Sequence, residues 1–371
     1  MVSIITILRG ITDPRTGNAT RHDLLEVLTI ALVASICGCE SCVEFADFAE
    51  DREELFREFL VLENGLPSHD TFSRLFRLLD PAALSSCFSH FLDRLGDDGP
   101  GVIAIDGKTL RRSFDRAAGR NPLHVVTAFA AEAQLVLGQR AVGEGENEIV
   151  AARALLGLID LEGALVTADA IHCNAATART VLERGGDWLF SLKANRPATL
   201  RDVEDWFADP AAAIADVHET TDADHGRVEI RRHAVVHDVA WLFPATRDPD
   251  RPAMPGLATI GRVEARVERG GRTSTSVRWY LSSAKLSAEA FARAVRKHWA
   301  IENGLHWVLD MAFDEDRARN RKDHGAENLA ILRKLALNVL KLARPEISIR
   351  RKRKRSAWSD AFARTVLGQM R

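Results

Sequence analysis

Three acidic residues stand where a carboxylate could take part in metal-dependent chemistry. Asp106 ends the apolar run VIAID, and Asp169 ends a second run, ALVTAD. Such short apolar runs predict buried strands, and the carboxyl end of a strand faces the crevice in which open α/β sheets bind ligands. A strand-end aspartate is also a common turn or capping residue, so either position alone is weak support for a site.

The third acid, Glu302, lies in the stretch HWAIENGLHWVLD, which has the spacing of a helix. At 100° per residue, Val295 and Leu309 fall within about 20° of Glu302, which places the glutamate in the middle of an apolar stripe. An unpaired carboxylate is costly there. A metal ion held over the sheet edge would offer it a partner, and His298, His306 or an arginine would be the structural alternative.

Three carboxylates brought close together repel one another unless cations neutralise them. An all-oxygen ligand set favours Mg²⁺ or Mn²⁺ over zinc. Two such ions about 3.5–4 Å apart can activate a water or a 3′-hydroxyl and stabilise the leaving oxygen in phosphoryl transfer. Asp310, Asp314, Glu315 and Asp316 are rival third ligands, but they lie toward the end of the expected helix, where binding to basic partners is the simpler role.

The elements that would position these acids follow from the periodicity of apolar residues. Residues 1–95 have helical spacing. Three short apolar runs follow, at 102–106, 123–131 and 134–142, and only two residues separate the last two, which predicts a hairpin. Helical and strand-like segments then alternate to about residue 209, which predicts a mixed sheet with helices packed on it.

The rest of the chain completes the expected division into domains. We expect an all-helical N-terminal domain over 1–95 and a linker at 96–101. An α/β catalytic domain should cover 101–345, with a β-rich insertion at about 210–284 before one long helix that carries Glu302. A basic tail with a short helix should cover 346–371.

The composition is that of an ordinary globular protein. The chain has 371 residues, of which 46% are hydrophobic and 27% charged, enough for two or three domains. It has no apolar run of membrane-spanning length, and its start lacks the pattern of a signal peptide. The five cysteines suit a reducing cytoplasm. We expect Cys37, Cys39 and Cys42 to be core residues rather than a metal knuckle, because no second cluster has a zinc-finger spacing.

The distribution of charge says more than the net charge of −2. Basic residues run without interruption from 350 to 355, and further groups lie at 111–116 and 317–322. Local basic patches on a neutral whole fit a protein that grips phosphates at chosen places. Solvated faces and tails would have the same appearance.

Several motifs, in order, resemble those of the H-repeat-associated insertion-sequence transposases. They are GLPSHDTFSRLFRLLDP, DGKTLRRS, TADAIHC with the following TAR, GGDWLFSLKANR, HGRVEIRR and HWAIENGLHWVLDMAFDEDRARNR, and the resemblance covers roughly residues 13–342. Those proteins are DDE transposases with a ribonuclease H-like core. The resemblance therefore implies an α/β fold: a ribonuclease H-like mixed sheet with flanking helices and a β-rich insertion, preceded by the helical domain.

By the same resemblance, Asp106, Asp169 and Glu302 would be the catalytic and metal-binding acids, with two ions of Mg²⁺ (or Mn²⁺) as cofactors. The acids are 63 and 133 residues apart. The second gap is wide for a bare core with short connections, and it fits the β-rich insertion. The chain departs from the wider group, which often has Tyr, Arg and Lys at −7, −4 and +7 from the glutamate. Val295, His298 and Leu309 occupy those positions, so roles of that Arg and Lys do not transfer.

Basic and polar residues near the acids or in the insertion are candidates for contacts with DNA phosphates, which position a protein without reading bases. A solvated or structural role is the alternative for each of them. The candidates are Lys108, Arg111, Arg112, His172, Lys193, Asn195, His225, Arg227, Arg231, His298 and Arg321.

The resemblance implies a DNA transposase that cleaves phosphodiester bonds at the ends of its element and joins the 3′-hydroxyl to target DNA. Its partners would be double-stranded DNA, as terminal inverted repeats and target, and a second copy of the chain on that DNA. We expect no membrane partner, no small-molecule cofactor, and a place in the prokaryotic cytoplasm at the nucleoid. The alternatives are a silent, transposase-derived DNA-binding protein, against which the three intact acids argue, and a metal-dependent nuclease without the joining step.

Overall fold

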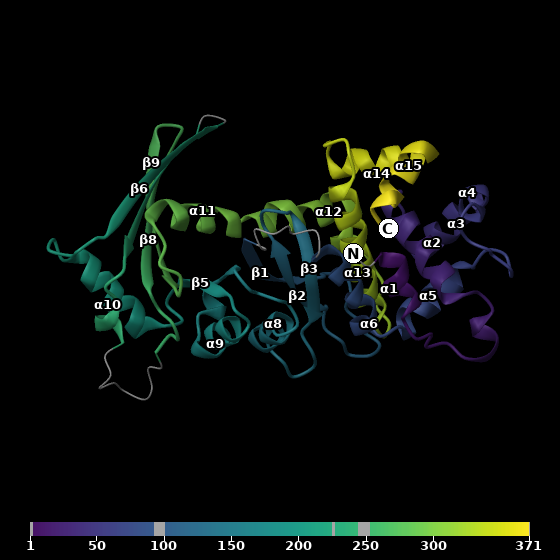
Figure 1. Ribbon diagram of the computed structural model, residues 1–371, viewed down its shortest axis with the longest axis horizontal. Coiled ribbons are helices and arrows are strands. Elements are labelled where there is room, and N and C mark those ends of the chain that lie inside the picture. Colours follow the sequence, from purple (N-terminus) through teal and green to yellow (C-terminus); the bar gives the residue numbers. More distant parts are fainter. Residues whose placement is uncertain (1–2, 93–100, 225–226, 244–252, 371) are drawn as a thin grey trace.

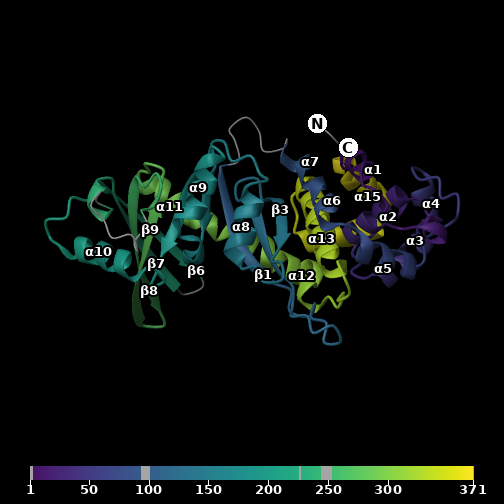
Figure 2. The same cartoon turned by 90° about the horizontal axis from the view of Figure 1, so that it is seen from below.

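The computed structural model describes residues 3–92, 101–224, 227–243 and 253–370. Residues 96–100 of the expected linker and His225 lie outside the described residues. The molecule is elongated, with helices at one end, a sheet flanked by helices in the middle and long strands at the other end (Figures 1 and 2). None of the described helices is both long enough and apolar enough to cross a membrane.

The N-terminal part is helical, as its apolar spacing predicts. Asp23 and Ser41 accept hydrogen bonds from backbone N–H groups three residues further on, at 3.0 and 3.3 Å, which caps two of the helices. Cys37 and Cys42 are buried among these helices, as expected of small core residues, whereas Cys39 is partly buried and packs against the same core. The helices are α1 (Ile4–Arg9), α2 (Leu24–Ile36), α3 (Cys42–Asp51), α4 (Glu53–Arg57), α5 (His69–Leu78), α6 (Pro81–Ser85) and α7 (Ser89–Leu92).

Within the described residues, a nine-stranded mixed sheet runs from the centre of the molecule to the end opposite the N-terminal helices (Figure 1), in the order β3-β2-β1-β4-β5-β9-β8-β7-β6. Its first three strands, β1 (Val102–Thr109), β2 (His124–Ala130) and β3 (Leu135–Ala141), are antiparallel neighbours. Strands β4 (Leu165–Ala168) and β5 (Asp187–Leu192) continue the sheet parallel to β1. Three antiparallel strands followed by two parallel ones are the ribonuclease H-like arrangement, and the expected fold class is confirmed.

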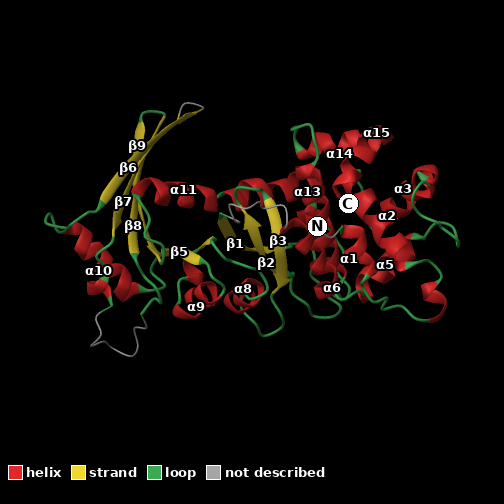
Figure 3. Ribbon diagram, in the orientation of Figure 1, coloured by secondary structure: helices red, strands yellow, loops and turns green. Residues whose placement is uncertain are grey.

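The β-rich segment extends this same sheet. Strand β9 (Arg272–Ser282) pairs antiparallel with β5, and β8 (Thr259–Arg269), β7 (Arg227–Val236) and β6 (Asp216–Asp224) follow outward. Figure 3 shows these strands projecting beyond the helices. The sequence did not predict β6 as a separate strand, because DVHETTDAD is acidic and has almost no apolar alternation.

Helices cover both faces of the sheet. On one face lie α8 (Glu148–Leu156), α9 (Ala175–Glu183) and α10 (Pro197–Ala208), and on the other α11 (Ala288–His298), α12 (Trp307–Phe313) and α13 (Gly325–Leu342). Side chains of a strand alternate between faces. Ile103 and Ile105 accordingly pack in the core under α8, whereas Ala104 packs in the core that contains α12, α13 and the N-terminal helices.

The expected long helix over 287–311 is interrupted. Helix α11 ends at His298, a π-helical turn spans Glu302–His306, and α12 begins at Trp307. The backbone N–H of Trp307 donates to the carbonyl of Glu302, five residues back, instead of four as in an α-helix. A wheel drawn at 100° per residue cannot anticipate this change of phase.

The basic run forms a helix, α14 (Ile349–Trp358), which precedes α15 (Asp360–Leu367). Two of its charges are buried. The Nζ atom of Lys352 donates to the carbonyls of Leu340 and Ala343 at 2.7 and 2.6 Å. Arg353 donates to the carbonyl of Ser35 and to Glu40, at 2.9 and 2.8 Å, and therefore ties α14 to the N-terminal helices.

Candidate active site

Strand alternation sets the direction of Asp106. Because Ala104 faces the helices α12 and α13, Asp106 and Lys108, two and four residues further on, belong to the same face. The pairing of β1 with β4 ends at Ile105, and β1 itself continues to Thr109 along β2. Asp106 is thus the first residue of β1 beyond its parallel neighbour, at the carboxyl-end edge that the sequence predicted.

Glu302 comes to the same edge from the helix side. Its side chain is 52% exposed, so it opens into a cavity instead of lying in the middle of the apolar stripe. Val295 and Leu309, which the wheel placed beside it, are buried. Because of the π turn, the carboxylate of Glu302 points in a different direction from these apolar side chains.

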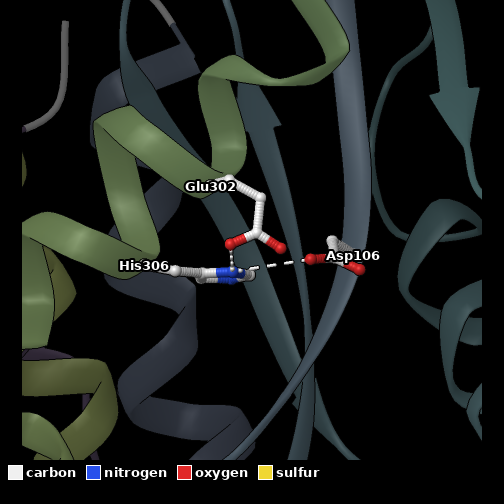
Figure 4. A group of neighbouring side chains, drawn as sticks. All are labelled: Asp106, Glu302 and His306. Atoms are coloured by element: carbon white, nitrogen blue, oxygen red, sulfur yellow. Dashed lines mark ion pairs between the residues drawn. The ribbon is translucent and has the colours of Figure 1, made fainter. Parts of the chain in front are cut away.

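Asp106 and Glu302 meet at a histidine (Figure 4). The Nδ1 atom of His306 lies 3.4 Å from Oδ2 of Asp106 and 3.6 Å from Oε2 of Glu302. One potential ligand atom from each of the three residues lies within 4.8 Å of the other two. This is the one group of such residues, within the described ranges, that could hold a metal ion.

The charges of this group are unfavourable without a cation. Burial, and then the nearby Glu302 carboxylate, raise the pKa of Asp106 to about 7. Burial lowers the pKa of His306 to about 4, so its imidazole is neutral near pH 7. In the described part of the chain, Nε2 of His306 is buried without a hydrogen-bond partner. Two carboxylates beside a neutral imidazole form a donor set that suits a divalent cation.

Asp169 follows β4 and lines the same cavity, of about 560 Å³, as Asp106 and Glu302. It is outside the group around His306, and its oxygens lie 2.9 and 3.2 Å from Nζ of Lys193. Although burial opposes ionisation, the hydrogen bonds from Lys193 hold the pKa of Asp169 below its usual value. The structure therefore brings all three acids to one cavity, with Lys193 beside Asp169.

His298 also lies at this cavity. Its Nδ1 atom is 3.1 Å from the hydroxyl of Thr167, on β4, and burial lowers the pKa of its imidazole. His298 and His306 each lie four residues from Glu302, on either side. His298 contacts β4, the strand before Asp169, and His306 contacts Asp106.

Lys108 is committed to acids of the protein itself. Its ammonium pairs with Asp310 and with Glu315, the latter at 3.2 Å, and its side chain is only 13% exposed. Although burial opposes its charge, these acids raise the pKa of Lys108. Its position does not favour the expected contact with DNA. The same ion pairs give Asp310 and Glu315 a basic partner, the role that the sequence suggested for them.

Arg111 and Arg112 are exposed next to this network. Arg111 lies 3.4 Å from Asp316. Arg321 donates from Nε to the carbonyl of Arg112 at 3.0 Å, and its guanidinium lies 4.3 Å from the ring centroid of Phe114. Both arginines after β1 remain open to a ligand, whereas Arg321 mainly holds the loop that carries them.

His172 and Asn195 hold the segment after Asp169. Asn195 donates to the carbonyl of Ala170 at 2.6 Å. His172 is buried, with Nε2 3.0 Å from one oxygen of Glu148, and His124 lies 2.7 Å from the other oxygen. The burial of His172 favours the structural role. Nothing in the sequence indicates the group that Glu148 forms, because its members are joined only by the fold.

The two candidates of the insertion that are described, Arg227 and Arg231, are held by acids. Arg227 lies 2.5 Å from Glu229, and Arg231 lies 2.5 and 2.9 Å from Asp222 and Glu229. Both line a second cavity, of about 890 Å³, between strands β6–β9 and α11. They do not line the acidic cavity itself, which adjoins the second cavity at Arg278 and Trp299.

The sequence matches a family described as "Transposase DDE domain" over residues 97–339, and a second family described as "DDE_Tnp_1-associated" over residues 5–92. The chain belongs to the DDE transposase family. Proteins of this family act in DNA transposition and generally use divalent metal ions.

The chain also aligns with individual known proteins. The chain is 34% identical over 363 residues to the "H repeat-associated putative transposase YhhI" of Escherichia coli K12, which covers 96% of this chain and 95% of the relative. It is 40% identical over 281 residues to an "Uncharacterized protein in dhlA 3'region" of Xanthobacter autotrophicus, over 74% of this chain and 92% of that one. A piggyBac transposase synaptic complex with hairpin DNA aligns over 97% of this chain and 76% of its own, at 11% identity and a TM-score of 0.41.

Proposed function

We propose that this insertion-sequence transposase hydrolyses a phosphodiester bond at each end of its element and then joins the freed 3′-hydroxyl to target DNA. One observation carries the proposal. Asp106 and Glu302 are 196 residues apart in the chain, yet they face each other at one cavity that Asp169 also lines. A fold that brings three acids from separate elements to one edge suits metal-dependent phosphoryl transfer.

The residues present fit divalent metal ions. The carboxylates of Asp106, Asp169 and Glu302 would hold them, because Mg²⁺ and Mn²⁺ both favour carboxylate oxygens, and the nitrogen of His306 would be an additional ligand that Mg²⁺ does not favour. When bound, such ions activate a water or a hydroxyl and neutralise charge on the leaving oxygen. The raised pKa of Asp106 supports this assignment, because its two main causes, burial and then the nearby Glu302 carboxylate, both disfavour the anion, and a bound cation would offset both.

The residues of the chain itself have distinct roles in this proposal. Lys193 pairs with Asp169 in the free protein. When a metal ion takes the place of its ammonium group beside Asp169, Lys193 would instead contact a DNA phosphate. His298, anchored on Thr167, keeps the helix of Glu302 against β4. Arg111 and Arg112 would contact phosphates beside the cleaved bond. The N-terminal helices would bind the element's terminal inverted repeat or a second subunit, because two ends must be held together for joining.

Strand cleavage and joining by the purified protein tests the proposal. A labelled double-stranded element end, an unlabelled target and Mg²⁺ should yield both a nicked end and a joined product. Asp106→Asn and Glu302→Gln should lose both products, whereas Asp314→Asn, a nearby exposed acid, should keep them. Nicking without joining would identify a nuclease. DNA binding without nicking would identify a silent DNA-binding protein, and equal cutting by all variants would remove Asp106 and Glu302 from the reaction.

A further inference from the structure

Glu302 is the first residue of the π-helical turn, and contacts from two other parts of the fold hold that turn. A π turn is rare and occurs mostly as a single bulge inside a helix. Its geometry must therefore be selected by the surroundings. The contacts that hold the turn are made at Gly304, two residues after Glu302.

The first contact comes from the tip of the β2–β3 hairpin. A Cβ atom on Gly304 would lie 2.4 Å from Oε1 of Gln134, so glycine allows this close approach, and any other residue would displace the end of that side chain. Gln134 has a backbone φ of 58°, which is uncommon for a residue with a side chain. It is steadied by a hydrogen bond of 2.8 Å from its Nε2 atom to the carbonyl of Ala131.

The second contact comes from the end of α13. The Nζ atom of Lys341 donates to the carbonyl of Gly304 at 2.9 Å and to Oε1 of Gln134 at 3.3 Å. It also lies 4.8 Å from the ring centroid of Phe129. Among the described residues, the close partners of this cation are two oxygens and a ring, with no carboxylate in contact. An amine placed in that way serves to hold a particular carbonyl.

We propose that Lys341 and Gln134 are positioning residues that fix the π turn and thereby aim the Glu302 carboxylate at Asp106. The inference rests on the proposed function of the Asp106–Glu302 site and adds the means by which that site is assembled. Without the contact at Gly304, the turn can relax toward an α-helix, which would rotate Glu302 relative to the residues that follow it. His306 belongs to the same turn, so both contributions from this helix depend on one support.

Two readouts on the full-length, DNA-free protein test the inference. Titration with Mn²⁺ in a calorimeter reports the site, and hydrogen exchange of the peptide covering residues 302–309 reports the turn. Lys341→Met should weaken Mn²⁺ binding by about tenfold, within the range found for residues that orient metal ligands, and should speed exchange of that peptide. Gln134→Ala should act in the same direction. Lys341→Arg, which keeps a donor, should recover most of the affinity, and Lys285→Met, an exposed control, should leave both readouts unchanged.

A double variant separates positioning from a general loss of structure. If Lys341 acts through Glu302, then Lys341→Met should cause a clearly smaller loss of Mn²⁺ affinity in the Glu302→Gln background, limited to the contribution of His306. An equal loss in both backgrounds, or unchanged exchange of residues 302–309 in Lys341→Met, would overturn the inference. Mn²⁺ binding by Glu302→Gln as tight as that of the parent would instead overturn the proposed metal site, and the exchange of residues 302–309 would then decide the support of the turn by itself.

Discussion

His306 and Asp106 face each other at 3.4 Å, although they are 200 residues apart in the chain. The same nitrogen of His306 lies 3.6 Å from Glu302. A neutral imidazole between two carboxylates is a poor arrangement for a protein that needs only to be stable, because neither acid gains a cationic partner from it. It is a sensible arrangement if a cation completes it.

His306 should therefore matter for metal binding as well as for packing. We expect His306→Gln to weaken Mn²⁺ binding by about 10–100-fold, the range for residues that ligate or orient a metal, and to slow Mn²⁺-supported cleavage correspondingly. Calorimetry and the cleavage assay would measure the two effects. His69→Gln, at an exposed histidine of α5, is the matched control. If His306→Gln binds Mn²⁺ as tightly as the parent does, His306 has no role in metal binding and contributes to packing alone.

Lys108 should be a stability residue. Glu315 is fully buried and has Lys108 and Lys334 as its cationic neighbours, at 3.2 and 3.9 Å. Lys108→Met leaves that acid with one distant partner, so we expect the free energy of unfolding to fall by about 3–5 kcal/mol. Denaturant unfolding would measure it, with Arg111→Met, at an exposed position, changing stability by less than about 0.5 kcal/mol. A Lys108→Met protein of parental stability would contradict the assignment.

The basic run of α14 should divide into structural and DNA-facing residues. Arg353→Ala removes the donors to Ser35 and the partner of Glu40, so we expect a loss of about 3–5 kcal/mol in the free energy of unfolding. Arg351→Ala, at an exposed neighbour, should keep stability and reduce the salt dependence of DNA binding by about one phosphate contact. The reverse pattern in thermal unfolding and salt titrations would contradict the division.

Lys341 should give the protein a measurable pH dependence. Burial, and then the charge of Lys352, lower the pKa of Lys341 from 10.5 to about 7. Between those values the unfolded chain binds more protons than the folded protein, so the contribution of Lys341 to stability rises with pH, by at most about 1.4 kcal/mol per unit. The stability of the parent relative to Lys341→Met should therefore increase from pH 7 to pH 9 in denaturant titrations. A difference that stays constant would place the pKa of Lys341 near its ordinary value, and a falling one would contradict the lowered pKa outright.

The sequence was sufficient for the parts of the site that depend on local pattern. The strands before Asp106 and Asp169 are short apolar runs that any buried strand of this length would show, and the structure has them as β1 and β4. The spacing around Glu302 predicts a helix packed on the sheet, which the structure has as α11 and α12, although Glu302 itself lies in the π turn between them. The neighbours Val295 and Leu309 are buried, as the wheel indicates.

What the sequence could not supply depends on contacts between distant residues. The π turn arises where Gln134 and Lys341 meet Gly304, and no local pattern encodes that meeting. The charge of Lys108 is satisfied by residues 202 and 207 positions away, and that of Arg353 by a carbonyl 318 positions away. A lone basic residue therefore looks the same in sequence whether it grips a phosphate or an acid of its own fold.

Asp106 and Glu302 should hold a metal ion together, and the rest of the proposed reaction depends on that ion. X-ray diffraction from crystals of the protein grown with Mn²⁺, at a wavelength where manganese scatters anomalously, would locate it. We expect an anomalous peak between the carboxylates of Asp106 and Glu302, beside His306, that is absent in Asp106→Asn. A peak at Asp310 and Asp316 instead, or an empty acidic cavity at a Mn²⁺ concentration that supports cleavage, would contradict the assignment of these two acids.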